Sequence, residues 1–205
     1  MNPSRRVVAC KGPMALIVAA LALALAGCGR ERASTPQTQQ ASAGEPAMSI
    51  TVTSTAFTAG QTIPKRHTGD GEDLSPPLSW IGVPAGAKEL ALIMEDPDAP
   101  VGLWVHWVLC KVPPGTAGLA EGVPKSPTLT EPAGAIQGKN SWSSGNVGYR
   151  GPAPPPGKPH RYIFRLYALN APLDVKPGLT RQQLLTATEG HVLAQGELTG
   201  LYGRR

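Results

Sequence analysis

The sequence predicts a mainly β fold with a few helices, formed by one domain over residues 48–205. Short apolar runs separated by turn residues recur along this part of the chain, and each run has the length of a strand. The 24 glycines and 22 prolines show no Gly-X-Y period, and they favour short strands joined by turns over a helical bundle or collagen. Hydrophobic residues make up 41% of the chain and charged residues 16%, which supplies enough apolar surface for a sizeable core.

Five of these runs are predicted to be the main strands: residues 50–53, 89–95, 105–112, 160–169 and 193–202. In the last run Ala194, Leu198 and Tyr202 share one face and polar residues share the other, as in a half-buried strand. The Pro- and Gly-rich segments 113–123 and 143–159 are too broken for regular structure and are predicted to be loops. Functional side chains are often found on such loops.

One helix is predicted over residues 180–189. Thr180 can cap its first turn, and Gln183 occupies the reciprocal position of a capping box. Leu184 belongs to an apolar stripe that can face the core, and Gly190 suits the C-terminal end of the helix. The helix therefore has a start signal, a buried face and a stop signal.

The N-terminal segment combines a basic start with an unbroken apolar run over residues 15–27. This length suits the core of a signal peptide better than a membrane span. The run closes with Leu-Ala-Gly before Cys28, which resembles the lipobox of bacterial lipoproteins, where the cysteine becomes the acylated first residue. We therefore predict a lipoprotein signal peptide at residues 1–27 and a stable membrane anchor at Cys28. An ordinary secretory signal or an uncleaved anchor is the alternative, and either would still export the domain.

Residues 28–47 are predicted to be a flexible tether. They are rich in Ser, Thr, Gln, Ala and Pro and nearly free of large apolar side chains, so they cannot bury enough surface to order themselves. The predicted location is the bacterial cell envelope, with the domain attached to a membrane by lipid and facing the periplasm or the exterior. Which membrane holds it is left open.

The charge of the chain argues against a nucleic-acid partner. The formal net charge is +5, and three of the basic residues lie before residue 28 where there is no acid, so 5 − 3 leaves +2. This charge is too small and too evenly spread for the basic face of a nucleic-acid-binding protein.

Two acids follow the predicted strand 89–95 in the segment Glu-Asp-Pro-Asp-Ala-Pro. Pro97 favours an extended Asp96, and two residues of extended chain would place the Asp96 and Asp98 carboxylates on the same side. Close carboxylates repel, and the pKa of one of them rises unless a cation or donors compensate, so such a pair often marks a polar site. The alternative is an acidic turn that merely ends the strand.

A histidine lies between two tryptophans in the next predicted strand. In regular strand alternation His106 shares its face with Val108 and Cys110, so it is predicted to point toward the interior. The alternative to a binding role is a hydrogen-bonded core histidine.

A glycine- and proline-rich loop then leads into the strand that carries His160 and Tyr162. The loop contains Gly-Tyr-Arg-Gly-Pro, ending at Pro152, and glycines let backbone N–H groups approach an anion closely. His160 and Tyr162 share a strand face and can add ring N–H and phenolic O–H donors. Together they predict a small-anion site, and the alternative is a rigid surface loop leading into a core strand.

The ordered motifs Asp-Pro-Asp-Ala-Pro, Trp-x-His-Trp, Gly-Tyr-x-Gly-Pro and His-Arg-Tyr resemble the phosphatidylethanolamine-binding protein (PEBP) family. More closely, they resemble its bacterial YbhB/YbcL branch, which is described as Raf kinase inhibitor-like. The resemblance covers about residues 50–202, nearly all of the predicted domain.

The resemblance implies a central antiparallel sheet flanked by a smaller sheet, with one shallow anion-binding pocket at a sheet edge. It also implies a cis peptide bond between Ala99 and Pro100, and a homodimer. Carried over position by position, the pocket would be lined by Asp96, Asp98, His106, Gly151, His160 and Tyr162, with Trp104 and Pro100 at its rim.

The leading functional hypothesis is a non-enzymatic binding module. Its pocket would recognise a phosphoryl or carboxylate group on a lipid head group, a metabolite or a protein partner. The sequence has no G-x-S-x-G, P-loop, dinucleotide-binding or H-E-x-x-H motif, so neither catalytic residues nor a cofactor are predicted. One alternative is a metal-assisted hydrolase that uses the pocket acids and histidines as ligands. Another is a protease or kinase inhibitor that acts through its surface loops.

Overall fold

The computed structural model describes residues 48–143 and 147–204. The predicted signal peptide at residues 1–27, its lipidation site Cys28 and the tether at residues 28–47 lie outside the described residues. No helix within the described ranges has both the length and the apolar character needed to cross a membrane.

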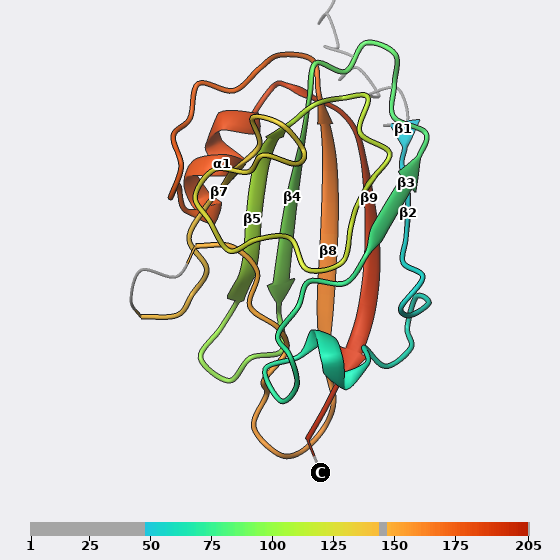
Figure 1. The fold of residues 1–205 in the computed structure, drawn as a ribbon, viewed down its shortest axis with the longest axis vertical. Helices are drawn as coiled ribbons and strands as arrows, with labels where there is room; N and C mark the ends of the chain where they lie inside the picture. Colours follow the sequence, from blue (N-terminus) through green and yellow to red (C-terminus); the bar gives the residue numbers. More distant parts are fainter. Residues whose placement is uncertain (1–47, 144–146, 205) are drawn as a thin grey trace, which may run out of the picture. The chain divides into compact units, whose positions relative to one another are not determined.

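The larger sheet has six strands in the order β1-β9-β8-β4-β5-β7 (Figure 1). In that order the strands are Met48–Ser49, Val192–Tyr202, His160–Leu169, Glu89–Asp96, Trp104–Val112 and Ile136–Gln137. β1 pairs with β9 in parallel, and every other pairing in this sheet is antiparallel. β4 occupies the centre and is buried at every position, which explains its continuous apolar run.

A smaller antiparallel sheet contains β2, β3 and β6, which span Thr51–Thr53, Leu78–Ile81 and Gly118–Leu119. The described residues also contain one 3₁₀ helix, η1 (Lys65–His67), and one α-helix, α1 (Arg181–Thr188). The predicted fold class is therefore confirmed, with a single α-helix in place of several.

The two faces of the larger sheet are buried by different elements. On one face Phe164 and Leu166 of β8 join the same core cluster as Val52 and Trp80 of the smaller sheet. On the other face Leu184 of α1 packs into a second cluster, and α1 lies beside β5 (Figure 1). The structure is thus a smaller sheet, a larger sheet and a helix in successive layers.

The helix forms for the reasons that the sequence indicates. The Thr180 side chain accepts a hydrogen bond from the Gln183 N–H, and the Gln183 side chain accepts one from the Thr180 N–H, which completes the predicted capping box. Buried Glu95 of β4 then pairs with Arg181 in the first turn and with Arg165 of β8. Two guanidinium groups satisfy this buried carboxylate, so the contact fixes α1 to the sheet.

The chain passes from the larger to the smaller sheet beside Gly196 of β9, and this close approach gives a test of the fold. A Cβ at Gly196 would lie 1.9 Å from the carbonyl oxygen of Ile50, which is backbone and cannot rotate away. We expect Gly196→Ala to lower the free energy of unfolding by more than about 1 kcal/mol in urea denaturation. Gly115→Ala is the control, because a Cβ there meets nothing within 4 Å. Equal unfolding midpoints for the two variants would contradict this packing.

Candidate functional site

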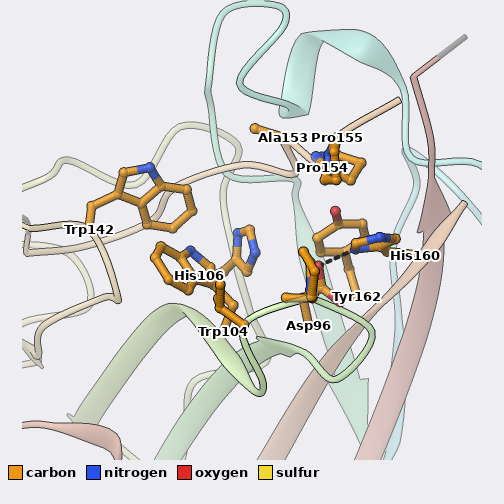
Figure 2. Close-up of a pocket in the computed structure, with 12 residues that line it drawn as sticks. Asp96, Trp104, His106, Trp142, Ala153, Pro154, Pro155, His160 and Tyr162 are labelled. Atoms are coloured by element: carbon orange, nitrogen blue, oxygen red, sulfur yellow. Dashed lines mark hydrogen bonds and ion pairs between the residues drawn. The ribbon is translucent and has the colours of Figure 1, made fainter. Parts of the chain in front are cut away.

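A cavity of about 220 Å³ opens where β4 ends and where β5 and β8 begin (Figure 2). Twelve residues line it: Asp96, Ala99, Pro100, Val101, Trp104, His106, Trp142, Ala153, Pro154, Pro155, His160 and Tyr162. Strand pairing explains why residues far apart in sequence meet here. Asp96 lies opposite Trp104 of β5, and the neighbouring Glu95 lies opposite Ile163 of β8.

A β-bulge in β5 places His106 in this cavity. Met94 of β4 pairs with Trp107, but the next β4 residue, Glu95, pairs with Val105, so His106 is the extra residue. The His106 ring consequently packs edge-to-face against Tyr162, with ring centroids 5.1 Å apart. The prediction that His106 lies on the face of Val108 was wrong, because the bulge interrupts the regular alternation.

The His106 ring is held in one protonation state. Its Nδ1 lies 2.6 Å from the carbonyl oxygen of Arg150, so Nδ1 carries the proton and donates it to that acceptor. Burial of the ring lowers the pKa of His106 from 6.5 to about 4. At neutral pH the ring is therefore uncharged, and its Nε2 presents a lone pair.

Asp96 and His160 form the ionisable pair of the cavity. The Nδ1 of His160 donates to Asp96 Oδ2 at 2.8 Å, and the backbone N–H of Asp98 donates to Asp96 Oδ1 at 2.8 Å. The Asp96 carboxylate is buried and each of its oxygens accepts one hydrogen bond. This contact fixes the orientation of the His160 ring at the cavity wall.

Tyr162 contributes a hydroxyl that has no internal partner. Its Oη is buried, and within the described part of the chain it is the single buried side-chain nitrogen or oxygen that lacks a hydrogen bond. Burial first, and then the charge of the nearby Asp96 carboxylate and the closeness of the two side chains, raise the pKa of Tyr162 well above its ordinary value. The group is thus a neutral O–H donor, and leaving such a group unpaired costs about 1–3 kcal/mol.

Aromatic side chains form one wall of the cavity (Figure 2). Trp142 packs edge-on against Trp104, with centroids 5.4 Å apart, and against His106, with centroids 5.0 Å apart. The Arg150 guanidinium lies over the Trp142 ring. Sequence reasoning missed Trp142, because an isolated Trp in a polar segment carries no periodic signal.

Asp98 does not join Asp96 in the cavity. The Asp98 N–H bonds back to the Asp96 side chain, so the chain turns at Pro97 and the two carboxylates diverge. Asp98 instead forms a two-pronged ion pair with Arg161, which holds the pKa of this carboxyl down at about 2. The expectation that both acids face one space was therefore wrong.

Gly151 does not line the cavity, and its backbone instead bonds to Asp73. Its N–H donates to Asp73 Oδ1 at 2.6 Å, so this N–H is unavailable to an anion. A Cβ at Gly151 would lie 2.5 Å from the carbonyl oxygen of His67, which explains the glycine as a close backbone approach. The prediction of a glycine-lined anion cradle fails here, since most of the following loop residues are prolines without an N–H.

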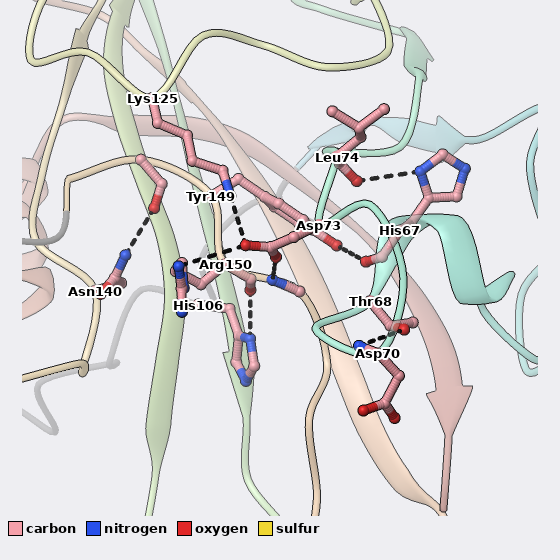
Figure 3. A network of polar contacts seen from close by, with 12 residues as sticks. His67, Thr68, Asp70, Asp73, Leu74, His106, Lys125, Asn140, Tyr149 and Arg150 are labelled. Carbon is pink, nitrogen blue, oxygen red and sulfur yellow. Dashed lines mark hydrogen bonds and ion pairs between the residues drawn. The ribbon is translucent and has the colours of Figure 1, made fainter.

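Asp73 connects the segments of this region through its polar contacts (Figure 3), and no sequence pattern predicted this role. Besides Gly151, it pairs with Lys125 at 2.5 Å and with Arg150 at 3.5 Å. The Arg150 N–H in turn donates to the His106 carbonyl oxygen, while the Arg150 carbonyl accepts from the His106 ring. Asp73 therefore positions His106 through the backbone of residues 150–151.

Pro100 lies at the cavity rim, but the peptide bond between Ala99 and Pro100 is trans, so the expected cis bond was wrong. The Gly102 N–H donates to the Ala99 carbonyl at 3.0 Å, which closes a turn. Pro100 is the second residue of this turn, a position that suits a trans proline. Among the described residues the cis peptide bond lies between Glu131 and Pro132.

The four residues proposed as metal ligands do not assemble. Asp98 is paired outside the cavity, and His106 and His160 each use Nδ1 in a contact with the protein. No group of three or more His, Cys, Asp or Glu residues in the described ranges has a geometry that could hold a metal ion. What the cavity offers is one paired carboxylate, two imidazoles and one unpartnered hydroxyl.

Comparisons with known proteins agree with this fold and arrangement. The pattern of the phosphatidylethanolamine-binding protein family matches residues 53–203. The chain is 54% identical over 149 residues to a UPF0098 protein of Methanothermobacter thermautotrophicus, covering 73% of this chain and 95% of that protein. It is 45% identical over 156 residues to a UPF0098 protein of Chlamydia muridarum, covering 74% and 97%.

Two crystal structures share the fold. One is a PEBP homolog from Chlamydia trachomatis, with 41% identity, a TM-score of 0.68 and coverage of 77% of this chain and 99% of that chain. The other is Escherichia coli YbcL, described as a member of the mammalian PEBP family, with 31% identity, a TM-score of 0.69 and coverage of 76% and 99%. The chain belongs to the PEBP family.

The lowered pKa of His106 predicts a specific dependence of stability on pH. Below pH 6.5 the unfolded state takes up a proton that the folded state resists until about pH 4, so stability falls as the pH falls through this window. Between pH 7 and about pH 4.5, the difference in proton uptake at His106 should lower the free energy of unfolding by about 2–3 kcal/mol. We expect His106→Gln to lose this part of the pH dependence in urea denaturation.

His191→Gln is the matched control. His191 lies outside the cavity and contacts Asn170, so its replacement should leave the acid-induced loss intact. The interpretation of His106 as a buried neutral imidazole would be wrong if the wild-type protein and His106→Gln lost the same stability between the two pH values.

Proposed function

We propose that the protein is a non-enzymatic binding module whose cavity takes a small anionic group, such as a phosphoryl group on a larger ligand. The observation that carries this proposal is the buried Tyr162 hydroxyl, which has no partner and belongs to the cavity lining. A ligand oxygen that accepts from this O–H would recover the cost of leaving it unpaired.

His160 would supply the positive charge in its imidazolium form. Because Asp96 accepts from Nδ1, protonation of His160 adds the second proton at Nε2. The charged ring is balanced by Asp96 and can donate from Nε2 to an anion, as in other charge-assisted hydrogen bonds. Tyr162 and His160 would then be the two donors, and Trp104 and Trp142 would flank the ligand.

An apolar rim supports a ligand with a non-polar part. Val101, a lining residue, is 76% exposed, and Leu103 in the same loop is 44% exposed. Exposed Pro155 and Pro156 lie in the loop across the cavity. Large apolar side chains exposed together often mark a binding surface. The rim would contact the remainder of the ligand, whether a lipid, a metabolite or a protein partner.

The proposed location follows from the sequence. Acylation of Cys28 would hold the domain at a membrane of the cell envelope through the tether at residues 28–47. Similarity to Escherichia coli YbcL supports the proposed place in the YbhB/YbcL branch. Mass spectrometry of the membrane fraction after expression of the full chain would test acylation, and Cys28→Ala should lack the added acyl mass.

Tyr162→Phe separates binding from folding. Removing the unpaired hydroxyl should leave the melting temperature unchanged or raise it, because a buried unsatisfied group disappears. The same variant should bind inorganic phosphate about tenfold more weakly in calorimetric titration, since it loses one hydrogen bond to a charged group. Opposite effects on stability and binding are the signature of a ligand-binding hydroxyl.

Tyr149→Phe is the matched control. Its hydroxyl is buried but donates to the His67 carbonyl oxygen at 2.5 Å, so its loss should lower stability and leave phosphate binding unchanged. The proposal fails if millimolar phosphate neither raises the wild-type melting temperature nor shifts the resonances of the cavity residues. It also fails if Tyr162→Phe binds phosphate as well as the wild type does.

A further inference from the structure

We propose that a groove formed by residues 113–124 and 131–133 binds an extended peptide that alternates small apolar and basic residues, and that this peptide adds as a strand to the edge of β6. The groove has a volume of about 480 Å³, which lies within the range of ligand-binding pockets in proteins. None of the residues that line it belongs to the cavity at the end of β4, so the inference goes beyond the proposed anion-binding function.

The groove belongs to the long connection between β5 and β7, which is the yellow-green path in Figure 1. This connection spans residues 113–135, and in a compact domain a connection longer than about 12–15 residues is usually either functional or disordered. Here its two sides are fixed. On the β6 side the Trp80 Nε1–H donates to the Thr116 carbonyl oxygen at 2.7 Å, and on the other side the Ala135 N–H donates to the Pro132 carbonyl oxygen at 3.1 Å. Because both walls are formed in advance, little ordering is needed when a peptide binds.

The backbone along one wall of the groove is available for pairing. β6 pairs with β3 on one side, and no strand of residues 48–143 and 147–204 pairs with it on the other. Directly after β6, the N–H and C=O groups of Ala120 and Glu121 make no backbone hydrogen bond to another described residue. Both residues line the groove together with Gly118. An extended peptide in the groove can therefore pair with these groups, as in strand addition at other sheet edges.

The side chains of the groove define the character of the peptide. Leu119 and Val123 give the lining an apolar part that is nearly buried. The ionisable lining residues are the exposed acids Glu121 and Glu131, and the lining contains no Lys or Arg. Arg66 pairs with Glu121 at 2.5 Å, whereas Glu131 forms no ion pair with a described residue, which leaves an excess of negative charge.

A strand is the backbone form that suits such a groove. Successive side chains of an extended peptide point to opposite faces, so one face can be apolar while the other is basic. The apolar face can pack against the apolar part of the lining, and the basic face complements the two carboxylates. Backbone pairing supplies affinity, and the alternation of side chains supplies specificity.

The direct test compares two acetylated and amidated peptides on the purified full chain, one with three Lys-Val repeats and one with three Glu-Val repeats. At constant low ionic strength, fluorescence anisotropy should give an affinity at least about tenfold higher for the Lys-Val peptide. The amide resonances of residues 118–121 and 131–133 should shift on binding. Equal affinity, no binding of either peptide, or unchanged resonances at these positions would overturn the inference. A dimer that buries residues 118–121 would also overturn it, because a second copy would then occupy the edge.

Methylated peptides test the backbone pairing. Alternate N–H groups of a strand point to opposite edges, so N-methylation of the Lys residues blocks one edge and N-methylation of the Val residues blocks the other. One of these two peptides should bind at least about tenfold more weakly than the unmethylated peptide, and the other should bind within about threefold of it. Strand addition would be excluded if both methylated peptides lost affinity equally or if neither did.

A double variant tests the role of the acids. Glu121→Gln with Glu131→Gln should bind the Lys-Val peptide at least about fivefold more weakly, since two rim charges are lost. Glu189→Gln with Glu197→Gln is the matched control, because it removes two exposed acids that do not line the groove. The control should bind within about twofold of the wild type. Equal weakening in the two double variants would assign the effect to net charge and overturn the inference.

Discussion

The cavity depends on a β-bulge, one extra residue in strand β5 of the larger sheet. The bulge at His106 moves an imidazole across β5 to the face where Asp96 and Tyr162 lie, and without it the ring would sit among the apolar side chains of the opposite core. The bulge costs one regular pairing between β4 and β5, and the contacts around Arg150 compensate for it. The Arg150 N–H and carbonyl bond to the backbone and ring of His106, so the bulge is held from the loop side.

Two acids near the cavity are held in ion pairs, so they do not compete for the polar groups that line it. Asp98 is paired with Arg161, and Asp70 with Arg204, and each ion pair holds the pKa of its carboxyl at about 2. These pairs are partly exposed, so their contribution to stability is small. Their effect is on the site: Asp98 and Asp70 each have a cationic partner outside the cavity, and Asp96 and His160 form the ionisable pair within it.

Periodicity predicted the long elements well, because they bury regular apolar faces. The range 160–169 coincides with β8, and the Thr180 capping box forms as expected. Two-residue strands such as β1, β6 and β7 carry no period and were missed. The bulge at His106 and the turn that separates Asp98 from Asp96 were also missed, since both depend on pairings made after the chain folds. Asp73 accepts a hydrogen bond from Gly151, which lies 78 residues away in the sequence, and no local pattern predicts such a contact.

Membership of the PEBP family follows from the matched pattern and the shared fold, whereas the ligand has to be argued from the polar groups of the cavity. The most direct measurement is a crystal structure of the protein grown with phosphate. We predict a phosphate whose oxygens lie within about 3.2 Å of Tyr162 Oη and His160 Nε2, with a further oxygen at the same range from His106 Nε2 or the Asp96 carboxylate. A cavity that holds only water at saturating phosphate, with the Tyr162 hydroxyl bonded to Asp96, would contradict anion binding at this site.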